Sequence, residues 1–264
     1  MLKKLLKNEF IATGRWMVVI YAILFGVTLI NKVMFELRSG DEFFNVYNKN
    51  LLINFFSGIM VLTYVLIIIG SVGLCVVFIV KRYYDNMYKD EGYLTFTLPV
   101  SAKEHLISKV LVAFTWYLLT TVSVVASVLI MASGHGVIKP LWNNISEMIK
   151  GNEKEAIIIV FLVIAEVLAL AIMPFFCITL GQNFREHRVL GAFVVYGAIY
   201  GINQILGLIF IMVWTRGKMY KMNSMAPNQV VRTVIIYQTI LVLTEIIITT
   251  LLTHRELEKN VNVE

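Results

Sequence analysis

The sequence predicts an all-α integral membrane protein with six transmembrane helices. Its 264 residues are 58% hydrophobic with a mean hydropathy of +0.77, well above the roughly 45–50% apolar content of soluble domains. A helix needs about 20 apolar residues to cross the roughly 30 Å hydrocarbon layer. Six runs meet that requirement, at residues 16–35, 51–80, 107–131, 156–180, 189–214 and 230–252.

The polar connections between these runs are too short to fold as soluble domains, so we expect one transmembrane domain over residues 1–264. A cleaved signal peptide is the alternative for the first run, because Lys3, Lys4 and Lys7 precede it. The run continues to Phe35 without a small-x-small cleavage site, which favours an uncleaved span.

Basic residues predict the orientation of the chain. Lys3, Lys4, Lys7 and Arg15 precede the first span and favour a cytoplasmic amino terminus, and six spans then return the carboxyl terminus to the same side. With Lys109 at the start of the third span included, the cytoplasmic side holds 13 of the 23 Lys and Arg residues, a modest bias of the expected sign. The net charge of +6 is spread over membrane-flanking loops, where anionic lipids explain it better than nucleic acid does.

Residues 1–15 are predicted to form an amphipathic interfacial helix. Leu2, Leu5, Leu6 and Phe10 share one helical face, while the lysines lie on the other faces. The apolar face would lie in the headgroup boundary, with the lysines near lipid phosphates. A simply solvated tail is the alternative.

The predicted cytoplasmic connection, residues 81–105, is the most informative part of the sequence. Rings and acidic groups alternate in it, a mixture typical of a protein-docking surface. These residues are Tyr83, Tyr84, Tyr88, Tyr93 and Phe96 together with Asp85, Asp90 and Glu91.

The same connection contains signals for helix ends. Gly92 can end a short helix formed by the residues before it, and Pro99 prevents simple continuation. Ser101 and Glu104 form a capping box, so the third membrane helix is predicted to start at Ser101.

Part of this connection resembles a known family. Residues 83–109, and above all the twelve residues 90–101, Asp-Glu-Gly-Tyr-Leu-Thr-Phe-Thr-Leu-Pro-Val-Ser, resemble the cytoplasmic loop of six-span permease subunits in bacterial ATP-binding-cassette exporters, of a type common in Firmicutes. The six-span layout, the amino-terminal helix and the short fourth-to-fifth connection also fit, but only the loop matches residue by residue. The resemblance implies a permease of the bacterial cell membrane.

In that family the loop forms a coupling helix that rests in a groove of the cytoplasmic ATPase. The resemblance therefore implies ATPase-docking roles for Asp90, Glu91, Gly92, Tyr93, Leu94, Phe96, Leu98 and Pro99. A second, smaller contact with the ATPase is implied for Gln182, Arg185 and Arg188. The connection 215–229 departs from the family pattern, because it is short and polar instead of forming apolar re-entrant helices. Residues 133–155 are left as the candidate cover of the outer exit.

The expected partners follow from what the chain lacks. No GxxxxGK(S/T) loop occurs in it, so ATP and magnesium are expected on a separate ATPase subunit, with no cofactor or metal in this chain. Six helices are few to enclose a route for a bulky cargo, so we expect a second copy or a paralogue. Gly197 and Gly201 have GxxxG spacing in the fifth span. This face can pair with the second permease or pack within the same subunit.

Two carboxylates fall inside predicted spans, Glu166 near the middle of the fourth and Glu245 toward the cytoplasmic end of the sixth. Such a carboxylate costs roughly 2.5–3.5 kcal/mol on insertion scales, so these residues usually face the protein interior or water. One interpretation is a cavity for a cationic or amphipathic peptide or a lipophilic toxin. The other is a protonated or hydrogen-bonded glutamate that joins helices. Pro174 is a candidate hinge in the fourth span, and Lys32 is expected to snorkel to the interface.

Two other function classes are less well supported. An intramembrane enzyme would need grouped nucleophiles or metal ligands, but no HExxH motif occurs, both cysteines fall inside predicted spans, and the four histidines lie in loops or at membrane edges. An ATP-independent carrier or channel could use Glu166 and Glu245 as an ion or proton path. The two three-span halves share no motif that would indicate the inverted repeat common in such carriers.

Overall fold

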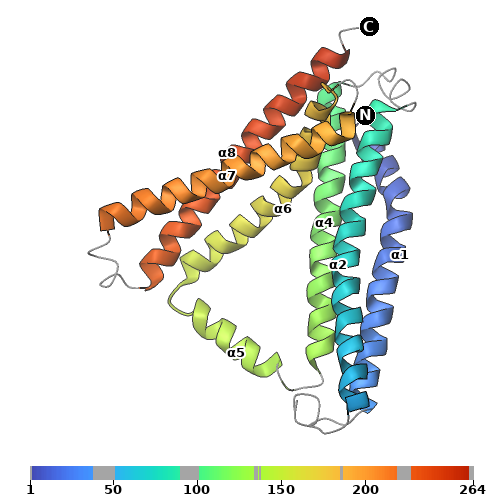
Figure 1. Ribbon diagram of the computed structural model, residues 1–264, viewed down its shortest axis with the longest axis vertical. Helices are drawn as coiled ribbons and strands as arrows, with labels where there is room; N and C mark the ends of the chain where they lie inside the picture. Colours follow the sequence, from blue (N-terminus) through green and yellow to red (C-terminus); the bar gives the residue numbers. More distant parts are fainter. Residues whose placement is uncertain are drawn as a thin grey trace. The chain divides into compact units, whose positions relative to one another are not determined.

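The structure, a computed structural model, describes residues 2–37, 51–89, 101–133, 136, 138–184, 187–218 and 227–261. Over these residues the chain is all-helical (Figure 1) and consists of α1 (Leu2–Leu37), α2 (Leu51–Tyr88), α4 (Ala102–Ala132), α5 (Ile138–Ile149), α6 (Glu153–Gly181), α7 (Arg188–Lys218) and α8 (Pro227–Val261). Six of them, all except α5, are long and apolar enough to cross a membrane. The prediction of an all-α, multi-pass protein with six spans is confirmed at this level.

The amino-terminal segment does not form a helix of its own. α1 runs without interruption from Leu2 to Leu37, so residues 2–15 are the first turns of the same helix that contains the first span. Continuing the helix keeps every backbone N–H and C=O group paired, whereas a break near Trp16 would leave several of these groups without partners. The interfacial position of residues 2–15 stays a prediction.

α2 extends eight residues beyond its predicted end at Val80 and stops at Tyr88. Residues 81–88 are therefore helical continuation, not a separate part of the predicted loop. The buried positions of α2 continue at helical spacing beyond the apolar run, through Cys75, Ile79, Tyr83 and Met87. Tyr83 is only 1% exposed, which corrects its assignment to a docking surface.

The predicted start of the third membrane helix is confirmed. α4 begins at Ala102, and the Glu104 backbone N–H donates to the Ser101 hydroxyl oxygen at 3.3 Å. A serine in this position satisfies a backbone donor that the first turn of a helix leaves unpaired.

The helices form two compact units, each described here by itself. Unit 1 comprises Met1–Arg82 and Leu111–Asn152, and unit 2 comprises Tyr83–Val110 and Glu153–Glu264. α2 and α4 each contribute to both units, because the division falls within these helices. The single domain expected over residues 1–264 stays a prediction.

In unit 1, α1, α2 and α4 run side by side (Figure 1), and polar side chains join them at several levels. Trp116 Nε1 of α4 donates to Thr13 Oγ1 of α1 at 2.8 Å, and Tyr21 Oη lies 2.9 Å from Thr120 Oγ1. Thr120 also donates to Cys75 Sγ of α2 at 3.2 Å. Each apolar span thus carries hydroxyl or indole groups whose partners lie on neighbouring helices, as expected for packing inside a membrane.

At the other end of α1, Lys32 Nζ donates to Ser133 Oγ at 2.7 Å and lies 3.7 Å from a Glu36 carboxylate oxygen. The lysine ammonium therefore has polar partners at the end of the span. This geometry agrees with the expected snorkelling of Lys32.

α5 is a strongly amphipathic helix that the sequence analysis did not predict. Its apolar side chains recur at helical spacing along one face, at Ile138, Leu141, Trp142, Ile145, Met148 and Ile149. All six are exposed, with Trp142 at 70% and Met148 at 74%. Gly136 and Gly151 lie before and after the helix with φ of +64° and +86°, a conformation that favours glycine and allows the chain to turn sharply.

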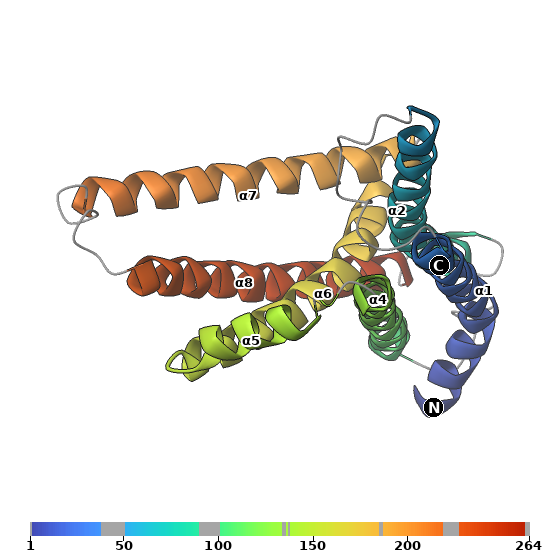
Figure 2. The ribbon, with the colours of Figure 1, turned by 90° about the horizontal axis from the view of Figure 1, so that it is seen from below.

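In unit 2, α6 and α7 pack tightly where they are joined. Met173, Phe176 and Cys177 of α6 form a buried cluster covered by Ala192, Val195 and Ile199 of α7. α7 then runs back against the direction of α6, and α8 returns in the direction of α6 (Figures 1 and 2). The antiparallel pair α6–α7 follows from the short connection between them.

The end of α6 requires glycine at position 181. A Cβ atom there would lie 2.7 Å from the Ala192 backbone nitrogen and 2.8 Å from the Arg188 carbonyl oxygen. Because both atoms belong to the backbone, the clash cannot be relieved by a side-chain rotation. Gly181 therefore sets how closely α7 approaches α6.

We expect Gly181→Ala to lower the free energy of unfolding by roughly 1–3 kcal/mol, the usual cost of overpacking. Thermal unfolding of the purified protein in detergent measures this change. Gly73→Ala is the matched control, because a Cβ atom at Gly73 would meet nothing within 4 Å and alanine favours the helix. Equal melting temperatures for the two variants would contradict the prediction.

Candidate functional site

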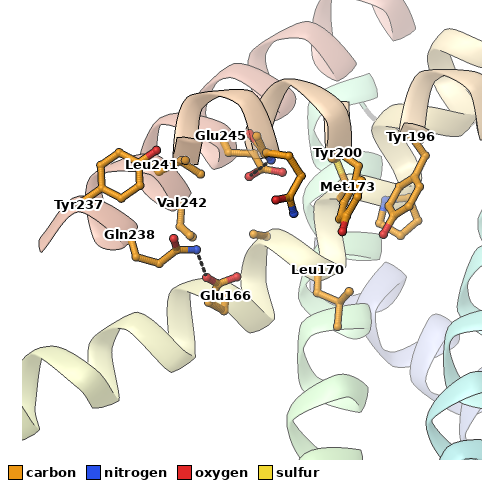
Figure 3. A pocket seen from close by; sticks show the side chains of 15 residues that line it. Glu166, Leu170, Met173, Tyr196, Tyr200, Tyr237, Gln238, Leu241, Val242 and Glu245 are labelled. Atoms are coloured by element: carbon orange, nitrogen blue, oxygen red, sulfur yellow. Dashed lines mark hydrogen bonds between the residues drawn. The ribbon is translucent and has the colours of Figure 1, made fainter. Parts of the chain in front are cut away.

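A cavity of about 420 Å³ lies between α6, α7 and α8, entirely within unit 2 (Figure 3). Each helix contributes one face to it, since the lining positions recur at intervals of three or four residues. The lining residues are Glu166, Ala169, Leu170, Met173 and Pro174 of α6, Tyr196, Tyr200, Asn203, Gln204 and Gly207 of α7, and Tyr237, Gln238, Leu241, Val242 and Glu245 of α8.

The structure brings the two intramembrane carboxylates into the wall of this one cavity. Glu166 lies near the middle of α6, and Glu245 lies near the middle of α8, because α8 extends past the predicted end of its span at Leu252 to Val261. Within its apolar run, residues 230–252, Glu245 still lies toward the end, because residues 253–261, which continue the helix, are mostly polar.

Each carboxylate accepts one hydrogen bond from an amide on another helix. Gln238 Nε2 of α8 donates to Glu166 Oε1 of α6 at 2.9 Å (Figure 3), and Asn203 Nδ2 of α7 donates to Glu245 Oε2 of α8 at 3.2 Å. These two bonds join α6 to α8 and α8 to α7. The two glutamates therefore line a cavity and also hold its helices together. Neither interpretation, a cargo cavity or a helix-joining glutamate, excludes the other.

Three tyrosines add ring surface and hydroxyl groups to the wall. Tyr196 and Tyr200 lie one helical turn apart on α7 and are 52% and 57% exposed. Tyr237 stacks on Phe210 of α7 with 3.8 Å between ring centroids. Its hydroxyl oxygen is buried and has no hydrogen-bond partner among the described residues.

Pro174 lies inside α6 and lines the cavity together with Leu170, one turn earlier. Proline has no backbone N–H, so the Leu170 carbonyl lacks its usual helical donor. α6 is therefore weakened where it forms the cavity wall, which is consistent with the expected role of Pro174 as a hinge.

The fifth-span polar residues are the part of the site that sequence reasoning missed. In that span only glycines were considered, Gly197 and Gly201 with Gly191 and Gly207 nearby, although Tyr196, Tyr200 and Asn203 form a polar stripe at helical spacing on it. This stripe is a usable signal, because an amide inside an apolar span is costly unless it has a partner. Gln238, which holds Glu166, carries the same signal in the sixth span.

Gly197 and Gly201 lie on a face of α7 next to the cavity. A Cβ atom at either position would meet no atom of the described chain within 4 Å. Within the described residues this face is therefore not used for close helix packing. Its pairing with a second permease stays a prediction.

The predicted ATPase contacts are only partly placed. Gln182 lies in the turn after α6, where its side-chain amide donates to the Ile178 carbonyl at 3.3 Å, and Arg188 is the first residue of α7. Arg185 lies outside the described residues. So do the eight docking residues predicted in the loop, Asp90, Glu91, Gly92, Tyr93, Leu94, Phe96, Leu98 and Pro99.

The ends of the loop that holds those eight residues are nevertheless described, and one of them is firmly attached. The Tyr83 ring of α2 stacks on Phe175 of α6 with 4.1 Å between centroids. Tyr83 Oη lies 2.8 Å from Thr179 Oγ1, and Tyr88 Oη donates to the same oxygen at 2.9 Å. We call Tyr83, Tyr88, Phe175 and Thr179 the α2–α6 clamp. It fixes the end of α2 on α6, one residue beyond the cavity-lining Pro174.

Comparison with known proteins does not assign this chain to a family. No family model, curated protein or solved structure matches this chain. Among the residues that the structure describes, no group of three or more His, Cys, Asp or Glu side chains could hold a metal ion.

Proposed function

We propose that the chain is the permease subunit of an ATP-driven exporter of the ATP-binding-cassette type, paired with a second permease and driven by separate ATPase subunits. The observation that carries this proposal is the run of residues 90–101, whose acidic and aromatic residues resemble the ATPase-docking loop of such permeases. ATP and magnesium would be bound by the ATPase subunits. The permeases would form the path through the bacterial cell membrane, with both termini of each chain in the cytoplasm.

The geometry next to the loop supports a mechanical role for it. α2 ends at Tyr88 and α4 begins at Ala102, so a rigid helix enters the loop and another leaves it. The α2–α6 clamp connects the first of these helices to α6, which forms one wall of the cavity. A force on the loop would thus reach the cavity through packed side chains and one continuous helix.

The cavity supports a transport function with a cationic or amphipathic cargo. Two carboxylates inside membrane spans are costly unless water, partner groups or a cation compensate them. Glu166 is exposed in the cavity wall and Glu245 is half-buried. A cationic cargo would pair with these charges during its passage.

The exporter proposal is tested by copurification. The chain is expressed from its native chromosomal locus with an affinity tag, and the proteins retained with it in mild detergent are identified. We expect a soluble ATPase with a phosphate-binding loop to be retained in a 1:1 ratio, and the complex to hydrolyse ATP. Retention of no nucleotide hydrolase, even after chemical crosslinking in intact cells, would contradict the proposal.

An ATP-independent carrier or channel is the second candidate, and the meeting of Glu166 and Glu245 in one cavity is the observation that favours it. Two neighbouring carboxylates can pass a proton or a cation between them. Reconstitution of the isolated chain into liposomes separates the two candidates. Full transport in the absence of nucleotide and ATPase would favour the carrier.

A further inference from the structure

The wall of the cavity between α6, α7 and α8 has a chemical bias beyond its two negative charges. None of its lining residues is Lys, Arg or His. The side-chain amides of Gln238 and Asn203 each place one N–H on a carboxylate and keep a carbonyl oxygen as an acceptor. The Leu170 carbonyl also lacks its helical donor. Tyrosine hydroxyls and the Gln204 amide supply donors as well as acceptors, so the bias of the wall lies in two acidic side chains with no basic one. It therefore suits a ligand that carries positive charge.

The size of the cavity limits the ligand. Its volume of about 420 Å³ lies in the lower part of the roughly 300–1,000 Å³ range of small-molecule pockets. This volume suits one compact organic molecule, or one side group of a larger ligand. A compact molecule is the ligand that would fill the cavity by itself.

The rings define where the apolar part of such a ligand would lie. Tyr196 and Tyr200 of α7 line the cavity and are both more than half exposed. Figure 3 shows them on one side of the two glutamates and Tyr237 on the other side. Tyrosine rings bind cations through their faces and also bind apolar groups. Carboxyl groups with rings beside them form an amphipathic site.

From these observations we infer that the cavity binds one compact lipophilic amine in its protonated form. Its ammonium group lies between Glu166 and Glu245, and its apolar body lies against Tyr196 and Tyr200. The inference rests on the proposed function as an account of the cargo, but the binding itself requires only this chain. It also explains how a membrane-embedded protein tolerates the two carboxylates, because the bound cation compensates them.

Binding is measured on the purified chain in nanodiscs, without nucleotide or ATPase, with empty nanodiscs as the blank. The probes are 9-aminoacridine, a flat aromatic amine that is cationic at neutral pH, and acridine, its neutral analogue. We expect saturable binding of 9-aminoacridine that is at least tenfold tighter than that of acridine. This comparison needs no variant, so it does not depend on a mutant folding correctly.

Variants then locate the site. Glu166→Gln and Glu245→Gln each remove one charge but keep an oxygen to accept the bond from Gln238 or Asn203, and each is expected to weaken binding about tenfold. Tyr200→Leu is expected to weaken it about threefold. Glu153→Gln, at the exposed first residue of α6 and outside the cavity, is the matched control and should change affinity less than twofold.

Three results would overturn the inference. They are equal binding of the cationic and neutral probes, unchanged affinity in both glutamine variants, and saturable binding of a lysine-rich peptide without saturable binding of 9-aminoacridine. Failure here is distinguishable from failure of the exporter proposal. If an ATPase copurifies but the probe does not bind, only the inference of a lipophilic amine as cargo is wrong. If the probe binds specifically but no ATPase copurifies, only the exporter proposal is wrong.

Discussion

Deletion of residues 91–94 is expected to abolish ATP-driven transport while the membrane helices stay folded. These residues, Glu-Gly-Tyr-Leu, form the centre of the proposed docking loop, and their loss removes acidic, aromatic and aliphatic groups that an ATPase would contact. The described helices on both sides of the loop do not depend on them, since α2 ends at Tyr88 and α4 starts with its own cap at Ser101. Transport into inverted membrane vesicles, with and without ATP, measures the effect.

The matched control is deletion of residues 41–44, an equally long piece of the connection predicted to face the exterior. This variant should retain most of its ATP-driven transport. Both variants should elute as a single species in gel filtration and give the helical circular dichroism of the wild type. If transport stays at the wild-type level after deletion of residues 91–94, the loop does not couple an ATPase to transport.

Tyr83→Ala is expected to destabilise the protein by about 3–5 kcal/mol, as for other truncations of large buried rings. Tyr83 is 1% exposed, and its ring stacks on Phe175 in the α2–α6 clamp. The substitution leaves a cavity and removes one hydrogen-bond partner of Thr179. Tyr83→Phe keeps the ring and should cost only about 1 kcal/mol, the usual net contribution of one hydrogen bond. Reversible unfolding in mixed detergent micelles measures both changes.

Tyr84 provides the control for this series. It neighbours Tyr83 in sequence but is only half-buried, and it lies near Lys89 with 5.6 Å between Nζ and the ring centroid. Tyr84→Ala should therefore cost much less than Tyr83→Ala. If the two alanine variants unfold at the same detergent composition, the clamp does not hold α2 on α6.

The spans were predictable because an apolar run of sufficient length has few alternatives to a membrane helix. The ends of the helices were less predictable, since polar residues such as 81–88 and 253–261 extend helices without a change in composition that marks the boundary. Tyr83 illustrates the difficulty. A tyrosine among charged residues resembles a surface residue, and only the partner helix α6 makes it a buried one.

The cavity could be predicted only in part. The cost of a carboxylate in the membrane drew attention to Glu166 and Glu245 separately, but two residues 79 positions apart in sequence give no indication that they share a wall. Their meeting depends on how α6 and α8 pack and on Gln238, which donates to Glu166. Apolar periodicity is also nearly uninformative in these spans, because lipid-facing and protein-facing sides are equally apolar.

The amphipathic helix α5 has a consequence for the depth of Glu166. A helix with an apolar face and a polar face satisfies both only at the boundary between hydrocarbon and water, and α5 is followed closely by α6, which begins at Glu153. The apolar run of α6 begins at Ala156, and Glu166 lies ten residues further along the helix, a distance of about 15 Å at 1.5 Å per residue. In a hydrocarbon layer roughly 30 Å thick, a helix that enters the layer next to an interfacial α5 brings this carboxylate to about the midplane. A cation then has a similar distance to travel to it from either leaflet.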